Sequence, residues 1–196
     1  MKKEFPQAIV LAAGKSSRLQ KFKPLLPLSN KTIIEHTVSS LYNICSDVFV
    51  VCGYRHGDIA KVLSGFEKIK MILNKDYQSG MFSSVIEGVK NISSERFFII
   101  PADMPFVKEI TYKELLEVDS EIVIPSFNGK KGHPVLFSKK LIPELLNCIN
   151  VFSLKDFIAK KTFVLKEVND NGILFDIDTK ENYDFALKYF ENLRTN

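Results

Sequence analysis

Five apolar runs, each about the length of one β-strand, constrain the fold of this chain more than any other feature of its 196 residues. Segments with apolar residues at helical spacing separate these runs from one another. Strands that are apolar almost throughout and alternate with helices are typical of a parallel sheet with helices on both faces. We therefore predict an α/β fold of three layers around a mostly parallel sheet. The expected strands are residues 7–13, 47–52, 69–73, 96–102 and 121–125.

Local capping signals indicate where the helices begin. Thr32 and Glu35 have the spacing of a capping box, in which a hydroxyl and a carboxylate satisfy two backbone N–H groups. Thr111 and Glu114 have the same spacing, so we expect a second helix to begin there. Residues 82–92 carry apolar side chains at helical spacing and predict a further helix.

The last third of the chain departs from this alternation. The sequence NGKKG at residues 128–132 is a turn signal between two apolar segments, so we expect an antiparallel hairpin there. Residues 163–168 and 173–178 are expected to form two more short strands. A final amphipathic helix is predicted to follow, capped by Asp178 or Thr179.

Composition and charge argue against several classes of function. The chain has a net charge of +4 and only four arginines, so it lacks the basic stripe of nucleic-acid-binding proteins. Its three cysteines have no metal-ligand spacing and indicate neither a disulfide framework nor a zinc site. The apolar runs are far shorter than the ~18 residues that a membrane-spanning helix needs. We expect a cytoplasmic protein in which residues 1–196 form one domain, with no nucleic-acid or membrane partner.

A glycine loop follows the first predicted strand. Gly14 has small neighbours, which lets backbone N–H groups approach an anion closely at the carboxyl end of that strand. Arg18 and Lys23 follow Gly14 and bring two cations to the same loop. The pattern predicts a phosphate-binding site. It lacks both the GK[ST] and the GxGxxG signatures, so a simple connecting loop with solvated cations stays open as an alternative.

Three carboxylates are candidates for a metal site. Asp103 directly follows a predicted strand, at the sheet edge where α/β proteins bind ligands. Asp176 and Asp178 occupy alternate positions of a predicted strand and would share one face. A Mg²⁺ ion that accompanies bound phosphates takes carboxylate oxygens as its preferred protein ligands. The alternatives are that Asp103 begins a proline turn and that Asp178 only caps the last helix.

The segment LAAGKSSRLQKFKPLLPL at residues 11–28 resembles the signature of the MobA-like nucleotidyltransferases. The resemblance implies a Rossmann-like domain of the nucleotide-diphospho-sugar transferase type, whose loop holds the triphosphate of a nucleotide. It implies phosphate contacts for Arg18 and Lys23, and metal ligation by Asp103 and Asp178, with Asp176 as a possible addition. The other nucleotide-binding residues that it implies are Leu11, Ala12, Ala13, Gly14, Asn74, Gly80, Ser83 and Ser84.

Two short segments are similar to the molybdenum cofactor cytidylyltransferase branch of that family. These segments are LAAG at residues 11–14 and GMFSS at residues 80–84, whereas the branch that uses GTP typically has LAGG. The sequence GHPV, which recurs in the cytidylyltransferase branch, implies that His133 lies on the acceptor side. We expect Lys130 and Lys131 to be solvated at the tip of the hairpin.

The resemblance therefore implies Mg²⁺-dependent transfer of CMP from CTP to the phosphate of molybdopterin, with release of pyrophosphate. Arg18, Lys23 and Asp103 are the expected catalytic residues, and they would act by alignment and charge neutralisation. The product would pass to an apo-molybdoenzyme of the xanthine oxidase family. Three alternatives stay open: another phosphorylated acceptor such as a sugar phosphate, GTP as the donor, or a non-catalytic nucleotide- or cofactor-binding protein.

Overall fold

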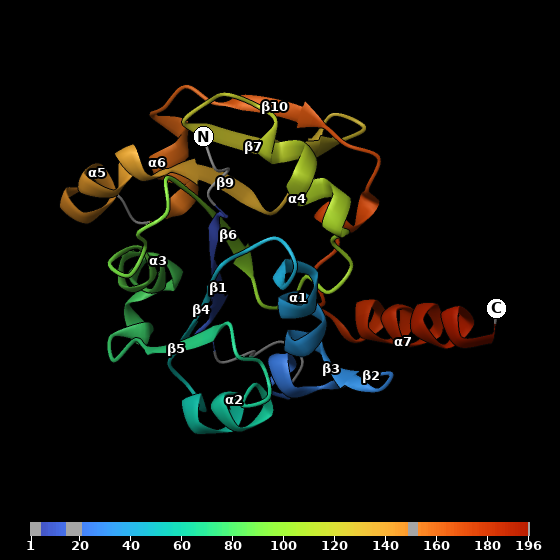
Figure 1. The fold of residues 1–196 in the computed structure, drawn as a ribbon. Coiled ribbons are helices and arrows are strands. Elements are labelled where there is room, and N and C mark those ends of the chain that lie inside the picture. The colour runs from blue at the N-terminus through green and yellow to red at the C-terminus, as the bar shows by residue number, and fades with distance from the viewer. Residues whose placement is uncertain (1–4, 15–20, 149–152, 196) are drawn as a thin grey trace.

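The computed structural model describes residues 5–14, 21–148 and 153–195, and an eight-stranded sheet forms its centre (Figure 1). The strands are β1 (Gln7–Ala12), β4 (Val48–Cys52), β5 (Ile69–Leu73), β6 (Arg96–Pro101), β7 (Ile122–Phe127), β8 (Lys130–Lys131), β9 (Val135–Ser138) and β10 (Val164–Glu167). Their order is β10-β7-β9-β6-β1-β4-β5, with β8 paired to β7. In the described sheet, β8 runs antiparallel to β7, and β9 runs antiparallel to both of its neighbours, β6 and β7. The mostly parallel sheet predicted from the apolar runs is confirmed.

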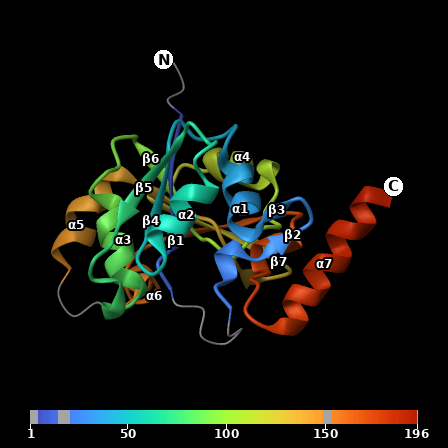
Figure 2. The same cartoon turned by 90° about the horizontal axis from the view of Figure 1, so that it is seen from below.

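Alternate residues of β1 enter two separate cores, one on each face of the sheet. Ala8, Val10 and Ala12 belong to one buried cluster, and Ile9 and Leu11 belong to the other. The helices over the first face are α1 (Ile33–Leu41), α2 (His56–Val62) and α4 (Glu109–Leu116), and those over the second are α3 (Met81–Val89), α5 (Ile142–Asn147) and α6 (Leu154–Ala159). Figure 2 shows α3, α5 and α6 on the side of the sheet opposite α1 and α4. Burial on both faces explains why the strand is apolar throughout.

The C-terminal helix α7 (Lys180–Thr195) lies outside these layers, at the periphery in both views (Figures 1 and 2). It packs beside a small antiparallel sheet of β2 (Pro27–Leu28) and β3 (Lys31–Thr32). A third buried cluster joins the two, and it includes Leu28, Ile33, Ile177 and Ala186. The helix therefore fixes the segment just before it, which includes Ile177, against the body of the protein.

One of the two predicted capping boxes forms and the other does not. The Thr32 hydroxyl accepts from the Glu35 backbone N–H, and the Glu35 carboxylate accepts from the Thr32 N–H at 2.7 Å, as predicted. The box expected at Thr111 is wrong, because α4 already begins after Lys108 and Thr111 lies within it. Asp170 supplies the cap instead: one of its oxygens accepts from the Lys108 N–H at 2.8 Å and from the Thr111 hydroxyl at 2.6 Å.

The hairpin predicted from NGKKG is confirmed, and so is the strand expected over residues 163–168, which is β10. Asn128 and Gly129 both have positive φ, as the tight turn between β7 and β8 requires. The strand expected over residues 173–178 is wrong. Asn171–Leu174 forms a 3₁₀ helix, η5, and the described residues that follow it pair with no strand.

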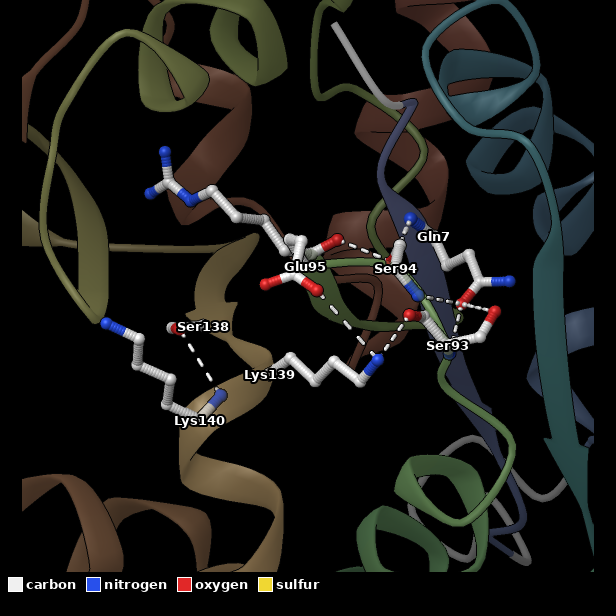
Figure 3. Close-up of polar contacts among 8 residues, drawn as sticks. Gln7, Ser93, Ser94, Glu95, Ser138, Lys139 and Lys140 are labelled. Atoms are coloured by element: carbon white, nitrogen blue, oxygen red, sulfur yellow. Dashed lines mark hydrogen bonds and ion pairs between the residues drawn. The ribbon is translucent and has the colours of Figure 1, made fainter. Parts of the chain in front are cut away.

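A polar cluster fixes the amino edge of the sheet, at the opposite end of β1 from its glycine loop (Figure 3). The side-chain oxygen of Gln7 accepts from the backbone N–H groups of Ser93 and Ser94 at 2.7 and 3.0 Å. The Gln7 amide donates to Asp47, and Lys139 donates to the Ser93 carbonyl at 2.8 Å. These bonds satisfy a buried glutamine and join the start of β1 to the loop before β6.

The three cysteines are free thiols, and Cys45 and Cys52 are buried. Burial raises the pKa of the Cys52 thiol to about 12, so it behaves as a small apolar core residue. Within the described ranges, no helix combines the length and apolar character that a membrane span requires.

Candidate nucleotide-binding site

A cleft of about 360 Å³ lies at the carboxyl ends of β1 and β6. The two strands are paired in parallel, with Leu11 opposite Pro101, so the segments that follow them leave the sheet side by side. Gly14 follows β1, and Asp103 follows β6. The lining residues are Leu11, Ala12, Gly14, Lys23, Pro24, Met81, Pro101, Ala102, Asp103, Asp176 and Asp178. Predicted site residues from three distant parts of the sequence thus meet in one cleft, at the edge where α/β proteins bind ligands.

Lys23 bridges two of the predicted metal ligands. Its Nζ lies 2.6 Å from Oδ2 of Asp103 and 2.5 Å from Oδ1 of Asp178. The lysine side chain is only 13% exposed. Burial favours the neutral amine, but the charges and hydrogen bonds of the two carboxylates outweigh it, so the pKa of Lys23 lies above its usual value. The ammonium is therefore a fixed positive charge at neutral pH.

Backbone contacts explain why these groups meet. Lys23 begins the 3₁₀ turn η2 (Lys23–Leu25), which contacts α1. The backbone N–H of Ile177 donates to the carbonyl of Asp103 at 3.0 Å, which holds the segment of Asp178 beside the end of β6. The Thr179 hydroxyl accepts from the Asn182 N–H at 3.2 Å, so the cap predicted at one of two residues lies at Thr179.

Asp176 adds a third carboxylate to the cleft. Partial burial raises the pKa of its carboxyl group, and the charges of Asp178 and Asp103 raise it further. Asp176 and Asp178 were expected on the same face of a strand, but these residues do not form a strand. The extended chain before α7 instead brings both side chains to the cleft lining.

The family model of the MobA-like NTP transferase domain matches residues 8–165 of this chain. The chain belongs to the MobA-like NTP transferase family. The molybdenum cofactor cytidylyltransferase of Escherichia coli is 28% identical over 176 residues, which are 89% of this chain and 92% of that protein. A probable molybdenum cofactor guanylyltransferase of Bacillus cereus is 27% identical over 206 residues, and the match covers 94% of this chain and 96% of that protein.

The fold agrees with this membership. A nucleotidyl transferase from Methanothermobacter thermautotroptrophicus superposes with a TM-score of 0.82 at 24% identity, over 98% of this chain and 99% of that one. The protein is thus a nucleotidyltransferase of the MobA-like type, related to molybdenum cofactor cytidylyl- and guanylyltransferases. The predicted fold class, of the nucleotide-diphospho-sugar transferase type, is confirmed.

The carboxylates of this cleft fit a divalent metal ion, and one structural neighbour, Rv0371C from Mycobacterium tuberculosis (18% identical, TM-score 0.77), is a complex with manganese. The Lys23 ammonium already lies between Asp103 and Asp178, which shows that the pair accommodates a cation. Nowhere in the described ranges do three or more His, Cys, Asp or Glu side chains form a ready-made metal cluster. Mg²⁺ commonly takes one or two carboxylates and completes its shell with water and substrate phosphates. Asp103 and Asp178 suit that mode of binding.

Three of the side chains predicted to bind the base form hydrogen bonds with one another. Asn74 is buried and its amide donates to Ser83 at 2.8 Å and to Ser84 at 3.0 Å, which joins the end of β5 to the start of α3. Gly80 precedes α3 with a φ of 107°, a value that favours glycine. None of these four residues lines the cleft, and neither does Ala13. Their role in binding the nucleotide stays a prediction, and Arg18 lies outside the described residues.

His133 lies beside a second cavity, of about 530 Å³, which shares Leu11, Met81 and Pro101 with the cleft. Burial lowers the pKa of the His133 imidazole, against the opposing effects of Asp103 and the Ile99 backbone. The ring is therefore neutral at pH 7. Its Nδ1 is buried and has no hydrogen-bond partner among the described residues.

The structure also places one residue in the site region that the sequence did not single out as functional. Lys131 lines the second cavity, and its Nζ lies 4.2 Å from the centre of the Phe163 ring. The expectation of a solvated lysine is therefore incomplete, because the side chain is exposed but rests on an aromatic face. Phe163 comes more than thirty positions later in the sequence, so no local pattern could have revealed the pair.

Proposed function

We propose that this nucleotidyltransferase transfers CMP from CTP to the terminal phosphate of a molybdopterin-type acceptor, with Mg²⁺ and with release of pyrophosphate. The observation that carries the proposal is the Lys23 ammonium bridging Asp103 and Asp178 in a cleft beside Gly14. A triphosphate and its metal ion need cations, carboxylates and free backbone N–H groups in one place. The Escherichia coli relative supports the choice of donor and acceptor.

In the reaction, an oxygen of the acceptor phosphate attacks the α-phosphorus of CTP in line. The bond from the α-phosphorus to the bridging oxygen breaks, and pyrophosphate leaves with that electron pair. Asp103 and Asp178 would hold Mg²⁺, which supplies positive charge next to the phosphates. Lys23 and Arg18 would neutralise the triphosphate and the leaving group. No side chain acts as a nucleophile, so catalysis consists of alignment and charge neutralisation.

The acceptor side of the proposal involves the second cavity. His133 lies there, and its neutral ring offers a buried nitrogen for a hydrogen bond to the acceptor. The cytidylylated cofactor would then pass to an apo-molybdoenzyme of the xanthine oxidase family. The three free cysteines suit the cytoplasmic location that we propose for the enzyme.

The choice of CTP rests on the LAAG and GMFSS segments, and guanylyl transfer is the second candidate because relatives include probable guanylyltransferases. We expect kcat/KM for CTP to exceed that for GTP at least ~10-fold, about 1.4 kcal/mol of discrimination. The measurement is pyrophosphate release by the purified protein with each nucleotide, Mg²⁺ and molybdopterin. Equal use of the two nucleotides, or a preference for GTP, would overturn the cytidylyl assignment and leave the family unchanged.

A further inference from the structure

The second cavity has an apolar interior and a cationic rim. Most of its lining side chains are aliphatic or aromatic, contributed by α3, α6 and strands β1, β6, β7 and β9. The polar side chains that line it are Lys131, His133, Ser153 and Lys155. None of the described lining residues is acidic. A ligand that fits this cavity therefore has an apolar surface and carries negative charge at the rim.

Lys131 is held at this rim by Phe163. An ammonium 4.2 Å from the ring centre is within the range of a favourable cation–π contact. Lys131 is nevertheless exposed, so its charge remains available to a ligand. The contact restricts the side chain, so less conformational freedom is lost when an anion binds. No carboxylate is within ion-pair distance of Lys131 among the described residues.

We propose that Lys131 is an acceptor-binding residue: it takes an anionic group of the acceptor at the rim, while the apolar cavity takes a flat ring system. The inference rests on the proposed function for the identity of the acceptor. It also bears on acceptor class, because sugar hydroxyls buried against apolar walls would lose hydrogen bonds to water, whereas a flat ring presents apolar faces. The Leu11, Met81 and Pro101 side chains shared with the cleft place the bound acceptor next to the nucleotide.

The neighbouring lysine provides a matched control. Lys130 and Lys131 are consecutive residues of β8, so their side chains leave opposite faces of the strand. Both are exposed and have the same charge, but only Lys131 lines the cavity. Lys130→Met and Lys131→Met therefore change the net charge equally and differ only in position.

Dye binding tests the cavity without the reaction. The probes are anilinonaphthalene sulfonate, an anion with an aromatic ring system, and phenyl-naphthylamine, the same ring system without the sulfonate. We expect Lys131→Met to weaken binding of the anionic dye roughly fivefold and to leave the uncharged dye unaffected. Lys130→Met should change neither. Ala159→Trp, which adds bulk at the exposed end of α6, should weaken both dyes because Ala159 lines the cavity.

Transfer kinetics test the role of Lys131 with the acceptor itself. Lys131→Met should raise the KM for molybdopterin severalfold, with kcat, the KM for CTP and the melting temperature unchanged, and Lys131→Arg should restore the KM. An unchanged acceptor KM, or equal dye binding by wild type and Lys131→Met, would overturn the inference. If no nucleotide is transferred to molybdopterin at all, the proposed function fails. The dye results then still decide whether Lys131 and the cavity bind an aromatic anion.

Discussion

At the scale of single residues, the most informative contact is the one between a lysine and two carboxylates in the candidate nucleotide-binding cleft. Lys23 is mostly buried and bridges Asp103 and Asp178, whose side chains are 18% and 31% exposed. Removing the ammonium would leave the two carboxylates close together without their cation. Uncompensated charges in partly buried positions are destabilising, so we expect this lysine to stabilise the ligand-free protein in addition to its proposed role in function.

We predict that Lys23→Met lowers kcat/KM on the order of 100-fold, because a cation on the triphosphate is lost. The ligand-free variant should also be less stable by about 1 kcal/mol, and Mg²⁺ should restore more stability in the variant than in wild type. Steady-state kinetics and thermal unfolding with and without Mg²⁺ measure these effects. Lys21→Met, an exposed change in the same segment, is the control. Full activity with a lower melting temperature would make Lys23 purely structural.

The two aspartates allow a separate test of the metal site. Asp103→Asn and Asp178→Asn keep the side-chain shape but remove charge that Mg²⁺ needs. We predict that Asp103→Asn nearly abolishes turnover with little change in folding. Asp178→Asn should lower turnover steeply and recover in part at high Mg²⁺, because the change weakens metal binding. The variant should still fold, because Thr179 caps α7 and that cap is kept. Measurement of kcat against Mg²⁺ concentration distinguishes the two. Normal activity of Asp103→Asn would show that the metal binds elsewhere.

At the scale of secondary-structure elements, Asp170 holds two of them together. Its carboxylate accepts from the Lys108 N–H and the Thr111 hydroxyl of α4, and from the Gly172 N–H of η5. Asp170 itself is 1% exposed. These contacts fix the start of α4 relative to the segment that leads to Asp178. The candidate metal ligands thus depend on a carboxylate that is not part of the site.

We predict that Asp170→Ala destabilises the protein by roughly 2–4 kcal/mol, since it leaves two buried donors and one partly buried donor without an acceptor. Glu109→Gln changes a half-exposed carboxylate in the first turn of the same helix, which pairs with Lys113 at the surface, and should cost no more than about 0.5 kcal/mol. Urea unfolding at neutral pH gives both values. A destabilisation of Asp170→Ala as small as that of Glu109→Gln would mean that water replaces the cap.

The elements that sequence analysis predicted correctly are those whose causes are local. Thr32 and Glu35 are three residues apart and need no other partner, so their capping box is visible in the sequence. Thr111 and Glu114 have the same spacing, but the distant Asp170 takes the Thr111 hydroxyl and moves the helix start. Residues 173–178 alternate like a strand, yet the described sheet offers them no partner.

The same distinction holds for the candidate site. Lys23 and Asp103 follow sequence signatures at strand ends, so the sequence alone predicts them and the structure brings them together. The predicted Asn74 and its serine partners instead satisfy one another between β5 and α3. The contact between Lys131 and Phe163 depends on how β8 and the chain after α6 meet in space, which no local pattern encodes.

At the scale of the whole molecule, the candidate nucleotide-binding cleft joins segments from the two halves of the chain. Gly14 follows β1, Asp103 follows β6 and Asp178 precedes α7, which packs on the β2–β3 sheet outside the main layers. A bound nucleotide would contact all three segments at once. Ligand binding therefore stabilises the folded chain as a unit, by an amount that follows from its affinity and concentration.

We predict that CTP with Mg²⁺, at about 100 times its Kd, stabilises the protein by about 2.7 kcal/mol. For a chain of this size that corresponds to a rise in melting temperature of roughly 5–10 °C.

CTP with a chelator should give a much smaller rise, because the triphosphate would face Asp103 and Asp178 without the metal charge. The Asp103→Asn variant should lose the Mg²⁺-dependent part of this rise in melting temperature. GTP at the same concentration should stabilise the protein less than CTP. Thermal unfolding of wild type and variant under these conditions makes the comparison. An equal rise with CTP in the presence of the chelator would show that nucleotide binding does not use the metal, and that the carboxylates of this cleft serve another purpose.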